Sequence, residues 1–191
     1  AVSAGYKREF LLSTGLSLER ETDGALRDRF YDRVMFPIHH ISGRVVGFGG
    51  RTLRTDKKVA KYQNSPESEI YNKRREVYGL YFAKKAIQQE DYAILVEGYA
   101  DVISMHQAGI ENVVASSGTS LTEEQIRLIS RFTTNITLMF DGDAAGVKAA
   151  IRGVDLVIKE GMNVRIVLLP EEHDPDTFAR AHTSEELRAY I

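Results

Sequence analysis

Three acidic residues directly follow apolar segments of the kind that form buried strands. Glu97 comes after the apolar residues 94–96, and Asp141 comes after residues 136–140, with Asp143 two positions further along. In an extended segment, side chains two residues apart point to the same side, so Asp141 and Asp143 share one side of the chain. Open parallel sheets bind their ligands beyond the carboxyl ends of the strands. The spacing therefore predicts that these carboxylates meet at the carboxyl edge of a sheet.

Three more acids could belong to the same group. Asp101 lies four residues after Glu97, one helical turn further on, and Asp174 and Asp176 follow another apolar segment. Carboxylates that converge in this way repel one another, which raises some of their pKa values unless a cation neutralises them. The motifs around Glu97 and Asp141 contain no His or Cys, and an all-oxygen ligand set suits Mg²⁺ or Mn²⁺. The pattern therefore indicates a site for divalent metal.

Each acid taken alone also has a structural interpretation. An Asp after a strand commonly forms a turn or caps a helix, and Asp143 could cap a helix that begins at Ala144. The acids are flanked by Gly98, Gly142 and Gly146, which would let the backbone or a ligand approach closely. Acids at two strand ends at once favour the metal site over separate structural roles.

The elements that would position these acids alternate between strands and helices. The strands are short and almost wholly apolar, which predicts a parallel sheet covered by helices on both faces. The predicted helices are residues 83–89, 101–108, 122–131 and 144–159, and the predicted strands are residues 92–96, 112–115, 136–140 and 164–169.

The residues before this α/β part follow a different pattern. A short helix is predicted between Ala4 and Gly15, and two apolar runs around Ser42-Gly43 predict a β-hairpin within residues 33–53. The basic, apolar-poor stretch 51–61 is predicted to be a loop.

The charges are divided unevenly along the chain. The net charge is −2, but residues 1–90 hold 17 Lys and Arg against 11 Asp and Glu, whereas residues 91–191 hold 8 against 16. This division suggests a basic surface for an anion beside an acidic site for metal. The alternative is two ordinary solvated faces.

Composition excludes several classes of protein. The 191 residues are 43% hydrophobic and 27% charged, which is an ordinary globular balance. The absence of cysteine excludes a disulfide framework and a cysteine zinc site. No apolar run approaches the length of a membrane span, and no signal peptide opens the sequence. The chain begins at Ala1 without Met, so we expect it to be a piece of a larger protein.

Several segments carry a family resemblance. Glu97-Gly98-Tyr99-Ala100-Asp101 and Asp141-Gly142-Asp143-Ala144-Ala145-Gly146 resemble the two signatures of the Toprim domain, which bacterial primases, type IA and II topoisomerases and some nucleases share. Others resemble the polymerase core of the DnaG-type bacterial replicative primase, over about Asp28 to Phe178. These segments are Arg33-Val34-Met35-Phe36-Pro37-Ile38, Gly47-Phe48-Gly49-Gly50-Arg51, Lys61-Tyr62-Gln63-Asn64-Ser65-Pro66-Glu67, Val77-Tyr78-Gly79-Leu80, Ala115-Ser116-Ser117-Gly118-Thr119 and Asp174-Pro175-Asp176.

The resemblance implies an α/β Toprim domain, with a parallel sheet flanked by helices, preceded by a partial α+β N-terminal subdomain. The implied domains are the basic N-terminal subdomain at residues 1–82, the Toprim catalytic domain at 83–180 and the start of a following helical segment at 181–191.

The resemblance also implies roles for individual residues. The catalytic residues and principal ligands of two or more Mg²⁺ or Mn²⁺ ions would be Glu97, Asp141 and Asp143, with Asp141 best placed to bridge two ions. Further members of the acidic site would be Asp101, Asp174 and Asp176. Positions that the family uses for template or nucleotide phosphates are occupied by Arg51, Lys61 and Lys73. Lys57 and Lys58 receive no role, because their loop is longer than usual in the family.

Some aromatic and histidine residues are weaker candidates. Tyr62, Tyr71 and Tyr78 could stack on bases, but aromatic residues near strands more often belong to the core. His106 is predicted to be structural.

The implied function is DNA-dependent synthesis of short RNA primers on single-stranded DNA by two-metal nucleotidyl transfer. The implied partners are a single-stranded DNA template, ribonucleoside triphosphates and a replicative helicase that docks on a C-terminal domain outside this chain. The zinc module of the family would also lie outside it, and no membrane is involved. The expected location is the cytoplasm, at the bacterial replication fork. Two alternatives are a Toprim nuclease or topoisomerase that uses the same acids, and a non-catalytic module that binds nucleic acid through the basic half.

Overall fold

The computed structural model describes residues 1–55 and 59–191, so Lys57 and Lys58 lie outside the described residues. Contacts divide the chain into two compact units. The first consists of Ala1–Ile38 and Arg44–Asn72, and the second of His39–Gly43 and Lys73–Ile191. The sequence analysis set its domain boundary between residues 82 and 83, and that assignment stays a prediction.

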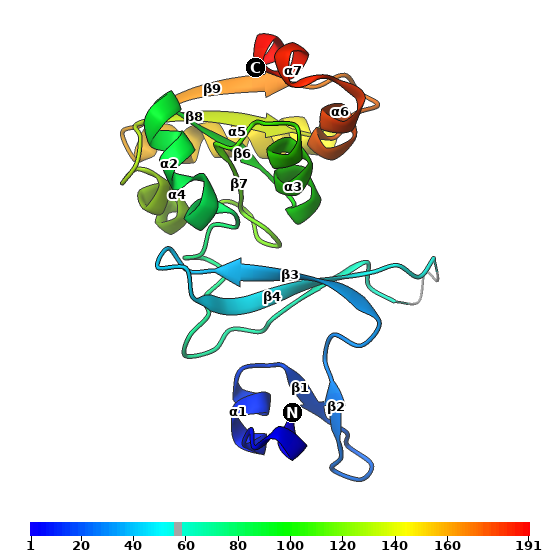
Figure 1. Cartoon of the computed structure of the whole chain (residues 1–191). Coiled ribbons are helices and arrows are strands. Elements are labelled where there is room, and N and C mark those ends of the chain that lie inside the picture. The colour runs from blue at the N-terminus through cyan, green and yellow to red at the C-terminus, as the bar shows by residue number, and fades with distance from the viewer. Residues whose placement is uncertain (56–58) are drawn as a thin grey trace. The chain divides into compact units, whose positions relative to one another are not determined.

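The first unit contains short helices and two small sheets (Figure 1). A 3₁₀ turn at Val2–Ala4 and α1 (Arg8–Ser13) precede the antiparallel pair β1 (Ser17–Glu19) and β2 (Leu26–Asp28). The second sheet has the order β3-β4-β5, with β3 at Arg33–His39, β4 at Val45–Thr52 and β5 at Tyr62–Asn64. The predicted pairing of the two apolar runs is confirmed, since β3 and β4 are neighbours joined through a turn at Gly43 (φ 90°).

The prediction that residues 51–61 form a loop is wrong for the first two residues. Arg51 and Thr52 belong to β4, because the end of β4 pairs with β5 in antiparallel register, Arg51 opposite Tyr62. The sequence indicated no strand at Tyr62–Asn64, since three residues are too few for a visible alternation and the pairing partner is distant in sequence.

The second unit is a four-stranded parallel sheet with helices on both faces, as predicted (Figure 1). The strand order is β7-β6-β8-β9. The elements in chain order are α2 (Leu80–Glu90), β6 (Ala93–Val96), α3 (Tyr99–Gln107), β7 (Val113–Ala115), α4 (Glu123–Ile129), β8 (Asn135–Phe140), α5 (Ala144–Lys159), β9 (Asn163–Leu168), α6 (Pro175–Ala181) and α7 (Ser184–Tyr190).

Alternate residues of the central strands enter two separate cores. In β6, Ala93 and Leu95 pack with residues of α2, α4 and α5, while Ile94 and Val96 pack with residues of α3, α6 and α7. All four of these strand residues are fully buried. A strand buried on both faces has no polar alternation, which explains its continuous apolar sequence.

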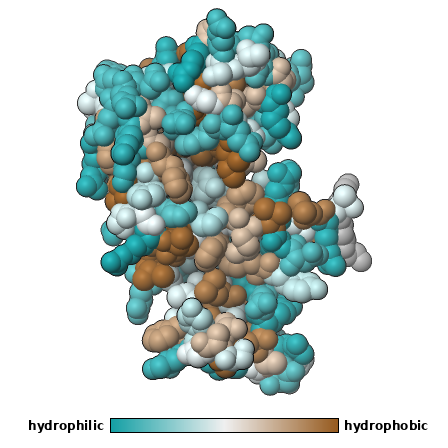
Figure 2. Space-filling view, viewed as in Figure 1, coloured by the Kyte–Doolittle hydropathy of each residue, from teal (hydrophilic) through white to brown (hydrophobic). Residues whose placement is uncertain are grey.

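Polar residues dominate the surface of the second unit on the face drawn in Figure 2, with single hydrophobic residues exposed among them. Within the described residues, no helix is long and apolar enough to cross a membrane.

Candidate functional site

Glu97, Asp141 and Asp143 lie at the carboxyl edge of the sheet and interact electrostatically. Glu97 follows β6, and the other two follow β8, the neighbouring strand. Partial burial raises the pKa of Glu97, and the negative charges of Asp141 and Asp143 raise it further, while Arg152 acts in the opposite direction. The two strand ends therefore bring these carboxylates together, as the sequence predicted.

The second group of acids joins the first through Asp141. Burial raises the pKa of the Asp141 carboxyl, and the charges of Asp174 and Asp143 add to this effect. Asp101 is 9% exposed, and burial raises its pKa to about 6, assisted by the charges of Asp174, Asp141 and Asp176. All six predicted acids thus share one electrostatic neighbourhood.

Several of these acids also stabilise helix ends. The Asp143 carboxylate accepts hydrogen bonds from the backbone N–H groups of Ala145 (2.9 Å) and Gly146 (2.8 Å), at the start of α5. Asp101 accepts one from the Gly98 N–H (2.8 Å), within the first turn of α3. The structural interpretation of Asp143 is therefore correct as well, and helix capping orients a carboxylate that also lies beside Glu97.

The two acids that open α6 are held by protein donors. Asp174 caps α6 by accepting from the Thr177 N–H at 2.7 Å. Although burial opposes ionisation of Asp174, the hydrogen bonds from Thr177 outweigh it and lower the pKa. Asp176 accepts from the Ser104 hydroxyl (2.5 Å) and pairs with Arg180 (3.1 Å).

The donor chemistry of this site fits a hard divalent cation, since every candidate ligand is a carboxylate and their mutual repulsion would be relieved by positive charge. Within the described residues, however, no group of three or more His, Cys, Asp or Glu side chains is arranged to hold a metal ion. The acids are therefore neighbours without forming a complete coordination shell.

Two glycines allow the backbone at this edge to pack closely. A Cβ on Gly142 would lie 2.5 Å from the carbonyl oxygens of both Leu169 and Pro170. A Cβ on Gly146 would overlap the carbonyl oxygen of Asp141. Glycine at these positions is therefore needed for the path of the chain between the two aspartates and α5.

The predicted basic residues are distributed over both units. Arg51, on β4, and Lys61 belong to the first unit, and Lys73 opens the second. The Arg51 guanidinium lies 5.7 Å from the centre of the Tyr62 ring. The side chains of Lys61 and Lys73 are exposed.

Gln125 is a connecting residue that the sequence analysis missed. It is fully buried on α4, and its side-chain NH₂ group donates to the carbonyl oxygens of Lys73 (3.1 Å), Glu76 (2.9 Å) and Ser116 (3.3 Å). It thereby joins the basic segment 73–76 to the loop that follows β7. A buried glutamine at the third position of a helix offers no sequence signal beyond a capping box.

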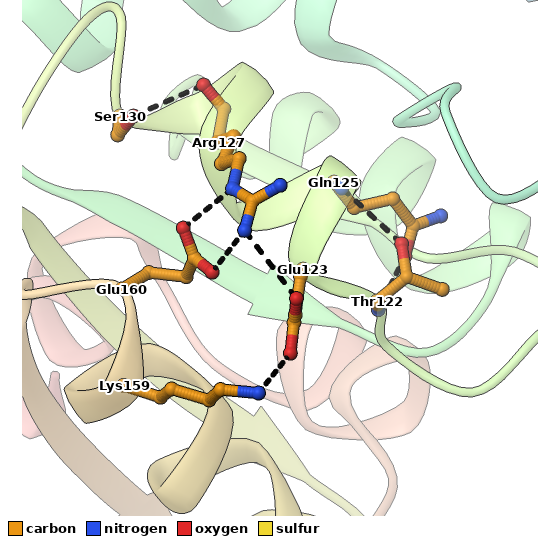
Figure 3. Close-up of polar contacts among 7 residues, drawn as sticks. All are labelled: Thr122, Glu123, Gln125, Arg127, Ser130, Lys159 and Glu160. Atoms are coloured by element: carbon orange, nitrogen blue, oxygen red, sulfur yellow. Dashed lines mark hydrogen bonds and ion pairs between the residues drawn. The ribbon is translucent and has the colours of Figure 1, made fainter.

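The capping box itself is present at the start of α4, and ion pairs connect α4 to α5 (Figure 3). Arg127 binds Glu160 at 2.7 Å and Glu123 at 3.3 Å, and Lys159 binds Glu123 at 2.5 Å. Figure 3 shows the Arg127 guanidinium between the two glutamates. These contacts fix the C-terminal end of α5 to α4.

The weaker candidates have structural contacts. His106 lies 3.1 Å from the carbonyl oxygen of Val113, as expected for a structural residue. Tyr71 is 2% exposed, and the Tyr78 ring packs edge-on against Tyr99 with centroids 4.7 Å apart. Both tyrosines therefore belong to packed regions.

Comparison with known protein families covers both halves of the chain. The family model for the N-terminal domain of the DNA primase catalytic core matches residues 1–84, and the Toprim-like model matches residues 94–179. These matches agree with the expected order of a primase-type subdomain followed by a Toprim fold.

Individual relatives and solved structures agree with the family models. The DNA primase of Halalkalibacterium halodurans is 47% identical over 175 residues, which are 92% of this chain and 29% of that protein. The Aquifex aeolicus primase structure, containing zinc-binding and RNA polymerase domains, matches with a TM-score of 0.89 and 45% identity, over 95% of this chain and 45% of that one. A DnaG primase catalytic domain bound to single-stranded DNA matches with a TM-score of 0.87 and 40% identity, over 98% of this chain and 61% of that one. This chain spans less than a third of the length of the curated relative.

Proposed function

Because this chain belongs to the DNA primase family, we propose that it is the part of a primase that synthesises short RNA primers on single-stranded DNA. The observation that carries the proposal is the meeting of Glu97, Asp141 and Asp143 at the carboxyl edge of a Toprim-like sheet. The similar catalytic domain bound to single-stranded DNA supports a single-stranded template as the partner.

The proposed reaction is nucleotidyl transfer. The 3′-hydroxyl oxygen forms a bond to the α-phosphorus of a ribonucleoside triphosphate, the hydroxyl proton passes to solvent, and pyrophosphate leaves with the electrons of the broken bond. Divalent cations supply Lewis-acid stabilisation of the charge on the reacting phosphate when they are bound.

The chain's own residues position the reactants in this proposal. Glu97, Asp141 and Asp143 hold the Mg²⁺ or Mn²⁺ ions, and capping of α5 fixes the direction of Asp143. The neighbouring Asp101, Asp174 and Asp176 add negative charge that favours cations at this edge.

The basic residues serve the nucleic acid and the nucleotide. Arg51, Lys61 and Lys73 bind phosphates of the template or of the triphosphate, without reading base sequence. A replicative helicase would act through a part of the protein outside this chain, and the work would take place in the bacterial cytoplasm at the replication fork.

The substitution Asp141→Asn in the full-length enzyme tests the proposal. Removing the charge of one of the carboxylates that would hold the divalent cations should lower primer synthesis by at least about 100-fold. The assay measures ribonucleotide incorporation on single-stranded DNA with Mg²⁺ or Mn²⁺. The control is the substitution Asp155→Asn, which lies on the following helix α5 and outside the acidic group. Near-normal synthesis by the Asp141→Asn enzyme would contradict the assignment.

The same assay separates the alternatives. Cleavage of DNA without ribonucleotide incorporation would favour a Toprim nuclease. Binding of DNA without either activity would favour a non-catalytic module.

A further inference from the structure

A cavity of about 500 Å³ opens beside Glu97, between the loop that follows β7 and helix α5. Its polar lining comes from Glu97 itself at the end next to the acids, from Ser116, Thr119 and Ser120 of the loop and from Arg152 of α5. The remaining wall is apolar and includes Phe140, the last residue of β8. All of these residues belong to the second unit.

The loop that forms one wall is held in an uncommon backbone conformation. Ser117 and Gly118 have φ values of 43° and 81°, so two consecutive residues are left-handed. The Ser117 N–H donates to the carbonyl oxygen of Glu97 at 3.1 Å, which ties the loop to the acidic site. The Ser117 hydroxyl is buried without a hydrogen-bond partner among the described residues. A left-handed backbone at a residue other than glycine is energetically unfavourable. It persists where the surrounding structure imposes it, often at ligand sites.

The walls of the cavity are fixed before any ligand binds. Gln125 bonds to the Ser116 carbonyl group on one side. On the other side, the ion pairs of Arg127 and Lys159 connect α4 to α5 (Figure 3). A preformed cavity loses less entropy when it binds a ligand.

Arg152 supplies the positive charge of the lining. Its side chain is exposed, it interacts electrostatically with Glu97, and it forms no hydrogen bond or ion pair with another described residue. A guanidinium offers paired donors that match phosphate oxygens, and hydroxyl groups donate to the same oxygens. The lining is thus suited to an anion with several oxygens placed next to the acids.

We propose that Arg152 and the hydroxyl groups of Ser116 and Thr119 bind the β- and γ-phosphates of the incoming ribonucleotide, and so the pyrophosphate that leaves. This inference rests on the proposed function. The base stays outside the cavity, free to pair with the template, while the α-phosphate lies at the acids near Glu97. Arg152 is then a binding residue for the leaving group.

The test uses the full-length enzyme with Arg152→Gln and Arg152→Lys, and with Lys148→Gln as the matched control. Lys148 is an exposed cation on the same helix and does not line the cavity. Binding of inorganic pyrophosphate with Mg²⁺ is measured by calorimetry, independently of primer synthesis. The Michaelis constant for ATP and the inhibition by pyrophosphate are then measured on a single-stranded template.

Loss of the guanidinium should weaken pyrophosphate binding and raise the Michaelis constant for ATP by at least about tenfold, with Lys148→Gln like the wild type. Arg152→Lys should recover part of the affinity, since it keeps the charge and loses the paired donors. Affinity for single-stranded DNA should not change.

Two results would overturn the inference. One is unchanged pyrophosphate binding in Arg152→Gln. The other is that Arg152→Gln changes only the Mg²⁺ concentration needed for activity, because Arg152 would then act only on Glu97. Failure of the proposed function itself is distinguishable, since the wild-type enzyme would then make no primers whatever the state of Arg152.

Discussion

Glu76 illustrates how burial changes the chemistry of a single side chain. One carboxylate oxygen of Glu76 is buried without a hydrogen-bond partner among the described residues. Burial raises the pKa of this carboxyl from 4.5 to about 7. The protonated form is therefore favoured in the folded protein, and folding binds a proton between these two pKa values. Its contribution to stability is present below pH 4.5 and is lost as the pH rises through about 7.

Glu76→Gln should remove this loss, because an amide has no charge to desolvate. At pH 8.5 the variant should be more stable than the wild type by about 1–2 kcal/mol, a value reduced from the full pKa shift because the side chain is only partly buried. At pH 4.5 the difference should vanish. Urea unfolding at both pH values measures it, with the exposed Glu111→Gln as the control. A constant difference between the two pH values would show that Glu76 does not titrate as described.

The sequence predicted where the acids lie better than it predicted the surroundings of individual side chains. Glu97, Asp141 and Asp143 were predictable because each follows an apolar strand, and the topology of parallel strands places such residues at one edge. Glu76 gave no signal, since its burial depends on contacts with segments remote in sequence. Arg152 was also missed, because nothing in a helical sequence indicates which exposed residue lines a cavity.

At the scale of elements, the parallel sheet and the pairing of β3 with β4 were predictable, and the three-residue strands of the antiparallel sheets were not. The four strands of the second unit are continuous apolar runs, so their positions could be predicted to within two residues. β1, β2 and β5 have three residues each, and their pairing partners rather than their own sequence make them strands. The helix at Ala144–Lys159 was predicted together with its cap, because capping is local.

Two glycines in α5 allow a matched test of close packing. Gly→Ala inside a helix ordinarily stabilises it by about 1 kcal/mol. Gly146→Ala should instead destabilise the protein by about 1–3 kcal/mol, because its Cβ would overlap the Asp141 carbonyl oxygen, which cannot move freely. Gly153→Ala should cost less, since its Cβ would meet the side chain of Leu138 at 2.9 Å, and that side chain can shift. Urea unfolding should rank the two variants in this order. Equal stability would mean that the loop at Asp141 adapts.

Gln125→Glu tests the connection between the basic segment and the loop after β7. Glutamate keeps the capping-box acceptor for the Thr122 N–H but replaces three donated hydrogen bonds with a carboxylate facing three carbonyl oxygens. The variant should lose about 2–3 kcal/mol of stability. Amide hydrogen exchange at Ser117 and Gly118 should accelerate by more than this global loss explains.

Thr122→Ala is the control for Gln125→Glu. It removes the side-chain cap of α4 and the hydrogen bond from the Thr122 hydroxyl to the Arg74 carbonyl oxygen (2.7 Å), but it leaves the three bonds donated by Gln125, including the one to the loop after β7, intact. It should cost about 1 kcal/mol and leave exchange in the loop slow. Unchanged exchange at Ser117 in Gln125→Glu would contradict the connecting role.

At the scale of the whole molecule, the chain combines a basic N-terminal half with an acidic C-terminal half. Residues 1–90 carry more Lys and Arg than Asp and Glu, and the reverse holds for residues 91–191. When basic side chains bind the phosphates of a nucleic acid, counterions are released, so the affinity depends on the salt concentration. Binding of a metal ion by carboxylates releases no counterions from DNA. We therefore expect substitutions of basic residues to change the salt dependence of DNA binding, and substitutions of the acids to leave it unchanged.

Arg51→Gln, Lys61→Gln and Lys73→Gln in the full-length enzyme should each weaken binding to single-stranded DNA. If the replaced residue contacts one phosphate, the slope of log K against log salt should become shallower by about 0.7. Lys148→Gln, which removes the same charge from the exposed face of α5, should leave the slope unchanged, as should Asp141→Asn. The measurement is a fluorescence titration of an oligonucleotide at several salt concentrations. An unchanged slope in all three variants would place the nucleic-acid surface elsewhere, because a contact with a phosphate cannot be removed without changing the number of counterions released.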